Sequence, residues 1–257
     1  MRLASSERLS ETGSDTVRSE NWGQASASAT IVCSDCPRNG KTLFAKLAAD
    51  LLSLRLGHPP HIFDTDEPDG SLITHFPNHG EIIDLSKTTE QVALFDGMLS
   101  QPDGHFLVDL EDRHFAHFFN IYRDIGFEAG AEEVGLDLSV FFLIDRTEAS
   151  IEAAAELSAS IPQTRFLTVR NSAIGDALSI GTSADIYHRM RIDREILLPQ
   201  LSPEALGMLE HPDFHFDTFI AGKYEHFPFE LKAELWSFLE GLYEQRDSVE
   251  RGSTYPV

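Results

Sequence analysis

The sequence predicts an α/β protein in which a mostly parallel central sheet is flanked by helices on both faces. Two observations lead to this prediction. Short apolar runs alternate with segments of helical periodicity between residues 29 and 245, as in proteins whose parallel strands are joined by helices. The apolar run at 138–144 is almost uninterrupted, which is typical of a strand buried on both faces. We therefore expect a single α/β domain at 29–245.

The first half of this domain opens with a strand at 29–33 and a helix at 42–56. The strand is a short run of small and apolar residues, and the helix repeats Leu43, Leu47 and Leu51 along one face. The further elements predicted for this half are strands at 61–64, 81–85 and 105–109 and helices at 88–99 and 113–128. Each strand is thus followed by a segment that can carry the chain back for a parallel pairing.

The second half continues the alternation and ends in an aromatic-rich region. Its predicted elements are strands at 138–144 and 165–170, a helix at 150–160, and helices between about 204 and 245. We expect the aromatic side chains between 214 and 238 to pack in the core, with a partner-docking surface as the alternative.

Both ends of the chain differ from this domain in composition. Residues 1–28 are rich in Ser, Glu and Thr and poor in large apolar side chains. Such a segment buries too little surface to offset the entropy of ordering, so we expect a flexible tail. Residues 246–257 are expected to form a second, loose tail.

The overall charge limits the partners of this protein. Its 42 acidic and 20 basic residues give a net charge of −22. A surface of this sign repels DNA and anionic lipid, so direct DNA binding is disfavoured and protein partners are favoured. The sequence has no run of about 20 apolar residues and no basic, apolar start, which predicts a cytoplasmic protein without a transmembrane segment or signal peptide.

The two cysteines, Cys33 and Cys36, stand close together. A C-x-x-C pair can form a redox centre or half of a metal site, but the sequence has no second pair to complete a Cys₄ zinc site. We interpret them as ordinary residues of a loop in a reducing cytosol.

The strand at 29–33 leads into a loop that ends in Asn39-Gly40-Lys41-Thr42, followed directly by a helix. In a phosphate-binding loop of this kind the backbone N–H groups wrap the phosphates, the lysine reaches the β- and γ-phosphates, and the Thr hydroxyl binds Mg²⁺. The helix N-terminus adds partial positive charge. The order strand, loop, helix therefore predicts a nucleotide site.

The loop departs from the pattern G-x-x-x-x-G-K-[ST] at its first position, which is Asp35. A carboxylate there would oppose a phosphate if it pointed inward, and a side chain restricts positive φ. A chance Gly-Lys-Thr, or a loop that has lost nucleotide binding, is the alternative interpretation.

Four polar residues follow strands, where ligands bind in parallel sheets. Asp109 could hold Mg²⁺ through water or simply turn the chain. Asp64 and Asp66 could position a water molecule or form a turn of the Asx type. Asn171 could pair with the adenine edge, since an amide carries a donor and an acceptor, or it could form a turn.

In the order of these motifs the chain resembles the ParA/MinD-like phosphate-loop (P-loop) ATPases over roughly residues 29 to 200. The matching segments are Gly40-Lys41-Thr42 with its helix, Asp64-Thr65-Asp66, the Walker B strand ending in Val108-Asp109, the turn at 143–148, and Asn171. The resemblance implies a Rossmann-like P-loop NTPase fold, binding of ATP and Mg²⁺, a nucleotide-dependent homodimer, and slow hydrolysis stimulated by a protein partner.

The resemblance also implies roles for single residues. Lys41 would contact the phosphates, Thr42 would bind Mg²⁺, and Asp109 would hold the water shell of the metal. Asp64 or Asp66 would lie near the attacking water.

One departure from the family concerns the lysine that reaches the partner's nucleotide. The family's loop usually reads K-G-G-x-G-K-[ST], whereas Arg38 is the cation between positions 35 and 39 here. Arg38 could replace that lysine or be an exposed loop residue. Without a replacement, we expect a nucleotide-binding switch or a vestigial scaffold that does not hydrolyse ATP. A P-loop kinase or phosphotransferase, with Asp109 or Asp112 as base, is a further alternative.

Overall fold

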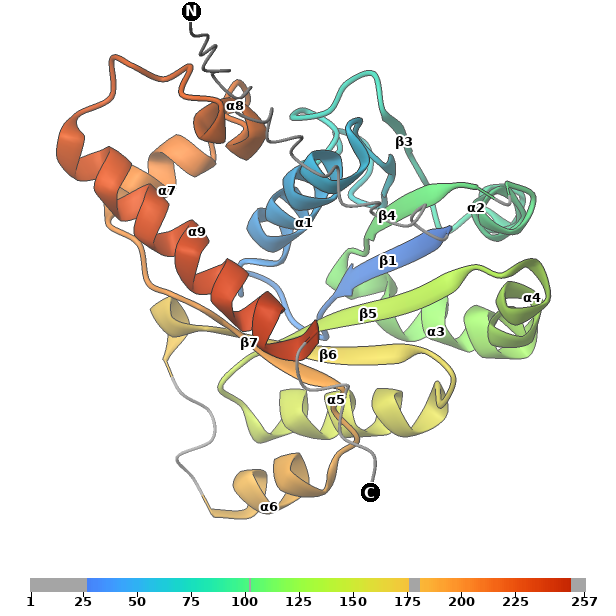
Figure 1. Cartoon of the computed structure of the whole chain (residues 1–257). Coiled ribbons are helices and arrows are strands. Elements are labelled where there is room, and N and C mark those ends of the chain that lie inside the picture. The colour runs from blue at the N-terminus through green and yellow to red at the C-terminus, as the bar shows by residue number, and fades with distance from the viewer. Residues whose placement is uncertain (1–26, 102, 176–180, 251–257) are drawn as a thin grey trace, which may run out of the picture.

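The computed structural model describes residues 27–101, 103–175 and 181–250 (Figure 1). Most of the expected N-terminal tail and the last seven positions of the C-terminal one therefore lie outside the described residues. Of the expected tail positions that are described, Ser28 belongs to the first strand and 246–250 to the last helix.

Within the described residues, seven strands form one sheet in the order β3-β2-β4-β1-β5-β6-β7. Every pairing in this sheet is parallel, so the expectation of a mostly parallel sheet is confirmed. The strands are β1 (Ser28–Cys33), β2 (His61–Asp64), β3 (Gly80–Ile82), β4 (His105–Asp109), β5 (Asp137–Ile144), β6 (Arg165–Asn171) and β7 (Arg194–Leu198).

The register brings the carboxyl ends of the central strands to one edge. Val32 of β1 and Asp64 of β2 both pair with Asp109 at the end of β4. Residues that follow these strands consequently emerge side by side, as expected for a parallel sheet.

Helices cover both faces of the sheet (Figure 1). One face carries α1 (Lys41–Leu56), α7 (Pro203–Leu209), α8 (Phe216–Ile220) and α9 (Phe229–Glu250). The other face carries α2 (Thr88–Leu99), α3 (Phe115–Asp124), α4 (Phe127–Val134), α5 (Glu148–Ser160) and α6 (Gly181–Arg189). Successive side chains of a strand point to opposite faces of the sheet. In β1, Ile31 therefore packs against the helices α2–α6, whereas Val32 packs on the face covered by α1 and α7–α9. The helices on both faces that the sequence predicts are therefore confirmed.

Several boundaries differ from those predicted. The helix expected at 113–128 is a 3₁₀ turn at Asp112–His114 followed by α3 and α4. The break falls at Gly126, whose φ of 66° ends one helix and redirects the chain. The third strand is shorter than the expected 81–85, and α6 and β7 had no counterpart in the prediction.

The aromatic region near the C-terminus is mainly core, as expected. Phe214, Phe216, Phe219, Phe227 and Phe238 are buried on the face covered by α1. Each buried ring contributes roughly 1.5–3 kcal/mol relative to an exposed one. Two rings of α9 are exceptions, because Phe229 is 79% and Trp236 41% exposed.

Candidate functional site

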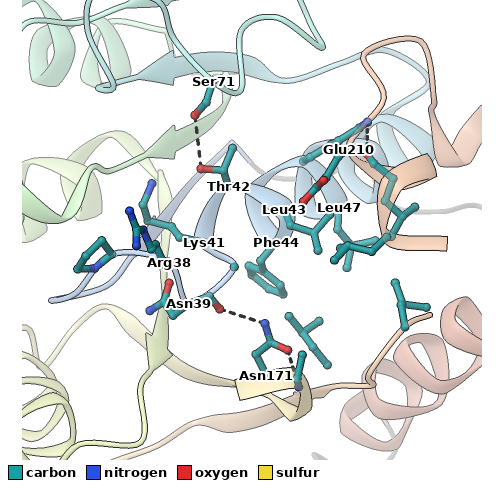
Figure 2. A pocket seen from close by; sticks show the side chains of 18 of the residues that line it. Arg38, Asn39, Lys41, Thr42, Leu43, Phe44, Leu47, Ser71, Asn171 and Glu210 are labelled. Atoms are coloured by element: carbon teal, nitrogen blue, oxygen red, sulfur yellow. Dashed lines mark hydrogen bonds between the residues drawn. The ribbon is translucent and has the colours of Figure 1, made fainter. Parts of the chain in front are cut away.

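A cavity of about 600 Å³ lies at the carboxyl ends of the central strands, beside the start of α1 (Figure 2). The loop at 36–42 forms one end of it, and residues of α7, α8 and α9 form the other. In Figure 2, Lys41 and Glu210 lie at opposite ends. The cavity is polar at the loop, and its other end is mainly apolar apart from Lys46 and Glu210.

The loop itself requires glycine at one position. Gly40 has φ 91° and immediately precedes α1. A Cβ on Gly40 would lie 2.7 Å from Nδ2 of Asn171, closer than such atoms approach. Gly40 is the N-cap residue and has no side chain that could cap α1, so it leaves the first N–H groups of the helix available to an anion.

Asp35, the departure at the first loop position, points away from the cavity. Its Oδ1 accepts a hydrogen bond from the Ser150 hydroxyl at 2.7 Å, at the start of α5. The Ser150 oxygen accepts in turn from the backbone N–H of Asp145 at 3.1 Å. Among the described residues, Arg38 is the non-glycine residue with positive φ, so Asp35 needs no glycine-like backbone. The carboxylate therefore does not oppose a phosphate in the cavity.

Lys41 is held by carboxylates at the end of the cavity that the loop forms. Its Nζ lies 2.6 Å from Oδ1 of Asp109 and 3.6 Å from Oε2 of Glu111, and its side chain is 8% exposed. Burial lowers the pKa of Lys41, but Asp109, Glu111 and Asp64 together raise it above its usual value. The ammonium therefore stays protonated and can meet a phosphate.

Asp109 is buried, and its Oδ2 has no hydrogen-bond partner among the described residues. A buried carboxylate oxygen of this kind normally has a partner, which a metal-bound water would supply. The Thr42 hydroxyl also faces the cavity, 3.4 Å from the Ser71 hydroxyl (Figure 2). Within the described chain, no three His, Cys, Asp or Glu side chains converge on a metal position. The residues present thus fit a Mg²⁺ ion held largely through water and phosphate oxygens.

The two carboxylates after β2 have different surroundings. Asp64 is fully buried and accepts hydrogen bonds from the backbone N–H groups of Asp66, Leu72 and Ile73 at 3.1, 2.7 and 3.0 Å. Burial and the neighbouring Asp109 raise the pKa of Asp64. Asp66, by contrast, lines the cavity. Asp64 therefore fixes the loop that presents Asp66.

Two asparagines, Asn39 and Asn171, hold the loop at 36–42 in place through hydrogen bonds to backbone carbonyl oxygens. Asn171 donates from Nδ2 to the carbonyl oxygen of Asn39 at 3.1 Å and accepts at Oδ1 from the N–H of Ala173 at 3.0 Å (Figure 2). Asn39 is buried and donates to the carbonyl oxygen of Leu143 at 3.1 Å. Asn171 thus forms the turn expected as one alternative, while it also lines the cavity.

Glu111 lines the cavity but did not stand out in the sequence. Burial and a hydrogen bond with Asp112 raise the pKa of Glu111 to about 7, although Lys41 acts in the opposite direction. The acidic run after β4 was the available signal for this residue.

The cysteines do not have the environment of a reactive pair. Both are free thiols, Cys33 buried and Cys36 partly exposed. Burial raises the pKa of Cys36 to about 11, so its thiol remains protonated at neutral pH.

No protein-family model and no curated protein sequence matches this chain. Its fold is similar to those of two solved structures. One is the nucleotide-binding protein of Archaeoglobus fulgidus in complex with ADP, with 15% identity and a TM-score of 0.44 over 74% of this chain and 90% of that one. The other is the MinC:MinD cell division protein complex of Aquifex aeolicus, with 13% identity and a TM-score of 0.45 over 90% of this chain and 98% of that one. At these identities and TM-scores the likeness concerns the fold alone. None of the helices within the described residues is long and apolar enough to cross a membrane.

Proposed function

We propose that this protein is a ParA/MinD-like ATPase that binds Mg²⁺-ATP in the cavity at the start of α1. The observation that carries the proposal is a protonated, buried Lys41 at an uncapped helix N-terminus, 2.6 Å from the strand-end carboxylate Asp109. A lysine and a helix terminus together favour a phosphate chain.

Each residue of the loop then has a role. The backbone of Asn39 and Gly40 surrounds the phosphates, and Lys41 binds their oxygens. Thr42 and Asp109 would hold Mg²⁺, which neutralises charge on the phosphates when it is bound. Asp66, which lines the cavity, orients the attacking water, while Asp64 keeps the loop after β2 in place.

Asn171 also lines the cavity and is the residue that we propose for recognition of the nucleotide base. Both polar groups of its amide already have partners in the loop and the following turn. We propose that Asn171 contacts the adenine edge through the second lone pair of Oδ1, which remains an available acceptor.

Arg38 supports a nucleotide-dependent homodimer. Its side chain is exposed, and its φ of 61° is unusual for a residue other than glycine. Backbone strain of about 1 kcal/mol is often retained at functional loops. We propose that Arg38 contacts the phosphates bound by a second copy, and that dimer formation controls binding of a protein partner in the cytoplasm.

The first experiment is thermal denaturation with Mg²⁺-ATP or Mg²⁺-ADP, for the wild type, Lys41→Ala and Lys223→Ala. Lys223 is an exposed lysine outside the cavity and serves as the matched control. A ligand at about 100 times its dissociation constant adds roughly 2.7 kcal/mol, or several degrees in the midpoint. We expect this shift in the wild type and in Lys223→Ala but not in Lys41→Ala. Equal midpoints with and without nucleotide in the wild type would refute the proposal.

A non-hydrolysing nucleotide switch is the second candidate. The exposure of Arg38 favours it, because this side chain faces solvent at the edge of the cavity and would shield the phosphates from water only if a second copy covered it. Release of inorganic phosphate separates the two functions. Hydrolysis that rises with protein concentration and is lost in Arg38→Ala supports the ATPase, whereas binding without phosphate release supports the switch.

A further inference from the structure

We infer that Glu111 is a specificity-determining residue of the nucleotide site, because its carboxylate competes with nucleotide phosphates for Lys41. The competition weakens binding of the triphosphate more than of the diphosphate. This inference rests on the proposed function and concerns how that site discriminates between its ligands.

The position of Glu111 is fixed by its backbone. Its N–H donates to the Thr65 hydroxyl at 2.8 Å, and this hydroxyl donates to the carbonyl oxygen of Asp109 at 3.1 Å. Thr65 is fully buried, so the two bonds tie the loop after β4 to the loop after β2. The backbone of Glu111 is therefore tied to both loops, and its side chain lies beside Lys41.

The charges around Lys41 are unbalanced. One ammonium faces the carboxylates of Asp109, Glu111 and Asp64, all of which raise the pKa of Lys41. Asp64 is bound by backbone N–H groups and Asp109 by Lys41 itself at 2.6 Å. Glu111 is the member of this group that is 24% exposed, lies 3.6 Å from Nζ and also lines the cavity.

A phosphate that binds to Lys41 comes close to the carboxylate of Glu111 and is repelled by it. A phosphate oxygen on Lys41 brings further negative charge within a few ångströms of Glu111, where partial burial makes charges interact more strongly than in bulk water. A triphosphate carries one charge more than a diphosphate and reaches further along Lys41. Glu111 consequently opposes ATP more than ADP, and bound Mg²⁺ offsets only part of this repulsion.

Glu210 offers a matched control for the loss of one negative charge. It lines the same cavity but lies at the end opposite Lys41 (Figure 2). Glu111→Gln and Glu210→Gln therefore change the net charge of the protein and of the cavity equally. A difference between them reports the contact with Lys41 rather than the overall charge.

The test measures dissociation constants of Mg²⁺-ATP and Mg²⁺-ADP by calorimetry at pH 8.5 and fixed ionic strength. We expect Glu111→Gln to tighten Mg²⁺-ATP by about tenfold and Mg²⁺-ADP by about threefold, and Glu210→Gln to change both less than twofold. Circular dichroism confirms folding, and Glu111→Ala replaces Glu111→Gln if the latter does not fold.

The outcomes separate this inference from the proposed function. Binding that is equal in the two glutamine variants, or weaker in Glu111→Gln than in the wild type, overturns the inference and leaves the proposed function intact. If Glu111→Gln binds the Mg²⁺-nucleotides measurably and the wild type does not, the result supports both the inference and the proposed function. Absence of binding in the wild type and in every variant refutes the proposed function and the inference with it.

Discussion

The ion pair between Lys41 and Asp109 leads to an unequal response to mutation of its two members. Lys41→Met removes the ammonium and leaves three carboxylates, those of Asp109, Glu111 and Asp64, without a cation. Asp109→Asn removes one carboxylate and leaves Lys41 with Glu111 at 3.6 Å. We therefore expect Lys41→Met to cost much more free energy of unfolding than Asp109→Asn, in the absence of nucleotide.

The magnitude follows from the burial of the pair. Lys41 is 8% exposed and the side chain of Asp109 is fully buried, so water does not replace the lost partner. Removing one member of a buried ion pair costs about 3–5 kcal/mol. Loss of a hydrogen bond to a charged group costs about 1.5–3 kcal/mol when another partner remains. For a domain of this size, Lys41→Met should lower the melting midpoint by on the order of 10 °C.

The double variant provides the sharpest test. Lys41→Met with Asp109→Asn removes the buried charge that the single lysine variant leaves unpaired, so it should be more stable than Lys41→Met alone. Urea denaturation of the wild type, both single variants and the double variant gives the four free energies at pH 7.5. If the two single costs are additive, or if Lys41→Met lies within about 0.5 kcal/mol of the wild type, the pair is not the buried contact described.

Three further predictions concern the loops and one histidine. Gly40→Ala should lower stability by about 1–3 kcal/mol and abolish nucleotide binding, because its Cβ would lie 2.7 Å from Asn171; urea denaturation and calorimetry measure the two effects. Asp35→Ala and Ser150→Ala should each cost about 1 kcal/mol, and the double variant no more than either, in a double-mutant cycle. Burial lowers the pKa of His75 to about 4, so between pH 6.5 and 4 the unfolded chain binds a proton that the folded chain does not. Stability is therefore lost as the pH falls, and His75→Gln should reduce the loss between pH 7 and 5 by at most about 2 kcal/mol, as measured by urea denaturation. An unchanged pH dependence would contradict this assignment.

The fold could be predicted from the sequence wherever local pattern and tertiary environment agree. The strands at His61–Asp64 and His105–Asp109 and the helix at Thr88–Leu99 have the predicted bounds, because short apolar runs and periodic segments end at clear breaks. The strand Arg194–Leu198 was missed, since charged residues open it and alternate burial suits an edge position. Gly126 did not stand out as a break, because a single glycine within a helical pattern does not reveal its φ.

For the candidate site, the sequence singled out those residues that belong to a recognisable motif. Lys41, Thr42 and Asp66 line the cavity, and Asp109 lies against Lys41. The roles of these residues remain predictions. The apolar end of the cavity could not be predicted, because it forms only when α7, α8 and α9 pack against α1. Glu111 was missed because its proximity to Lys41 depends on the register of β1 and β4.

The hydrogen bond from Ser150 to Asp35 bears on how loops of this kind are found from sequence patterns. Patterns that require glycine at the first loop position would pass over this chain, yet the backbone there does not call for one. A broader pattern would accept an acidic residue at that position when a serine lies in the first turn of the helix after the fifth strand. Covariation of these two positions across genomes would then identify loops that have exchanged a glycine for a side-chain tether.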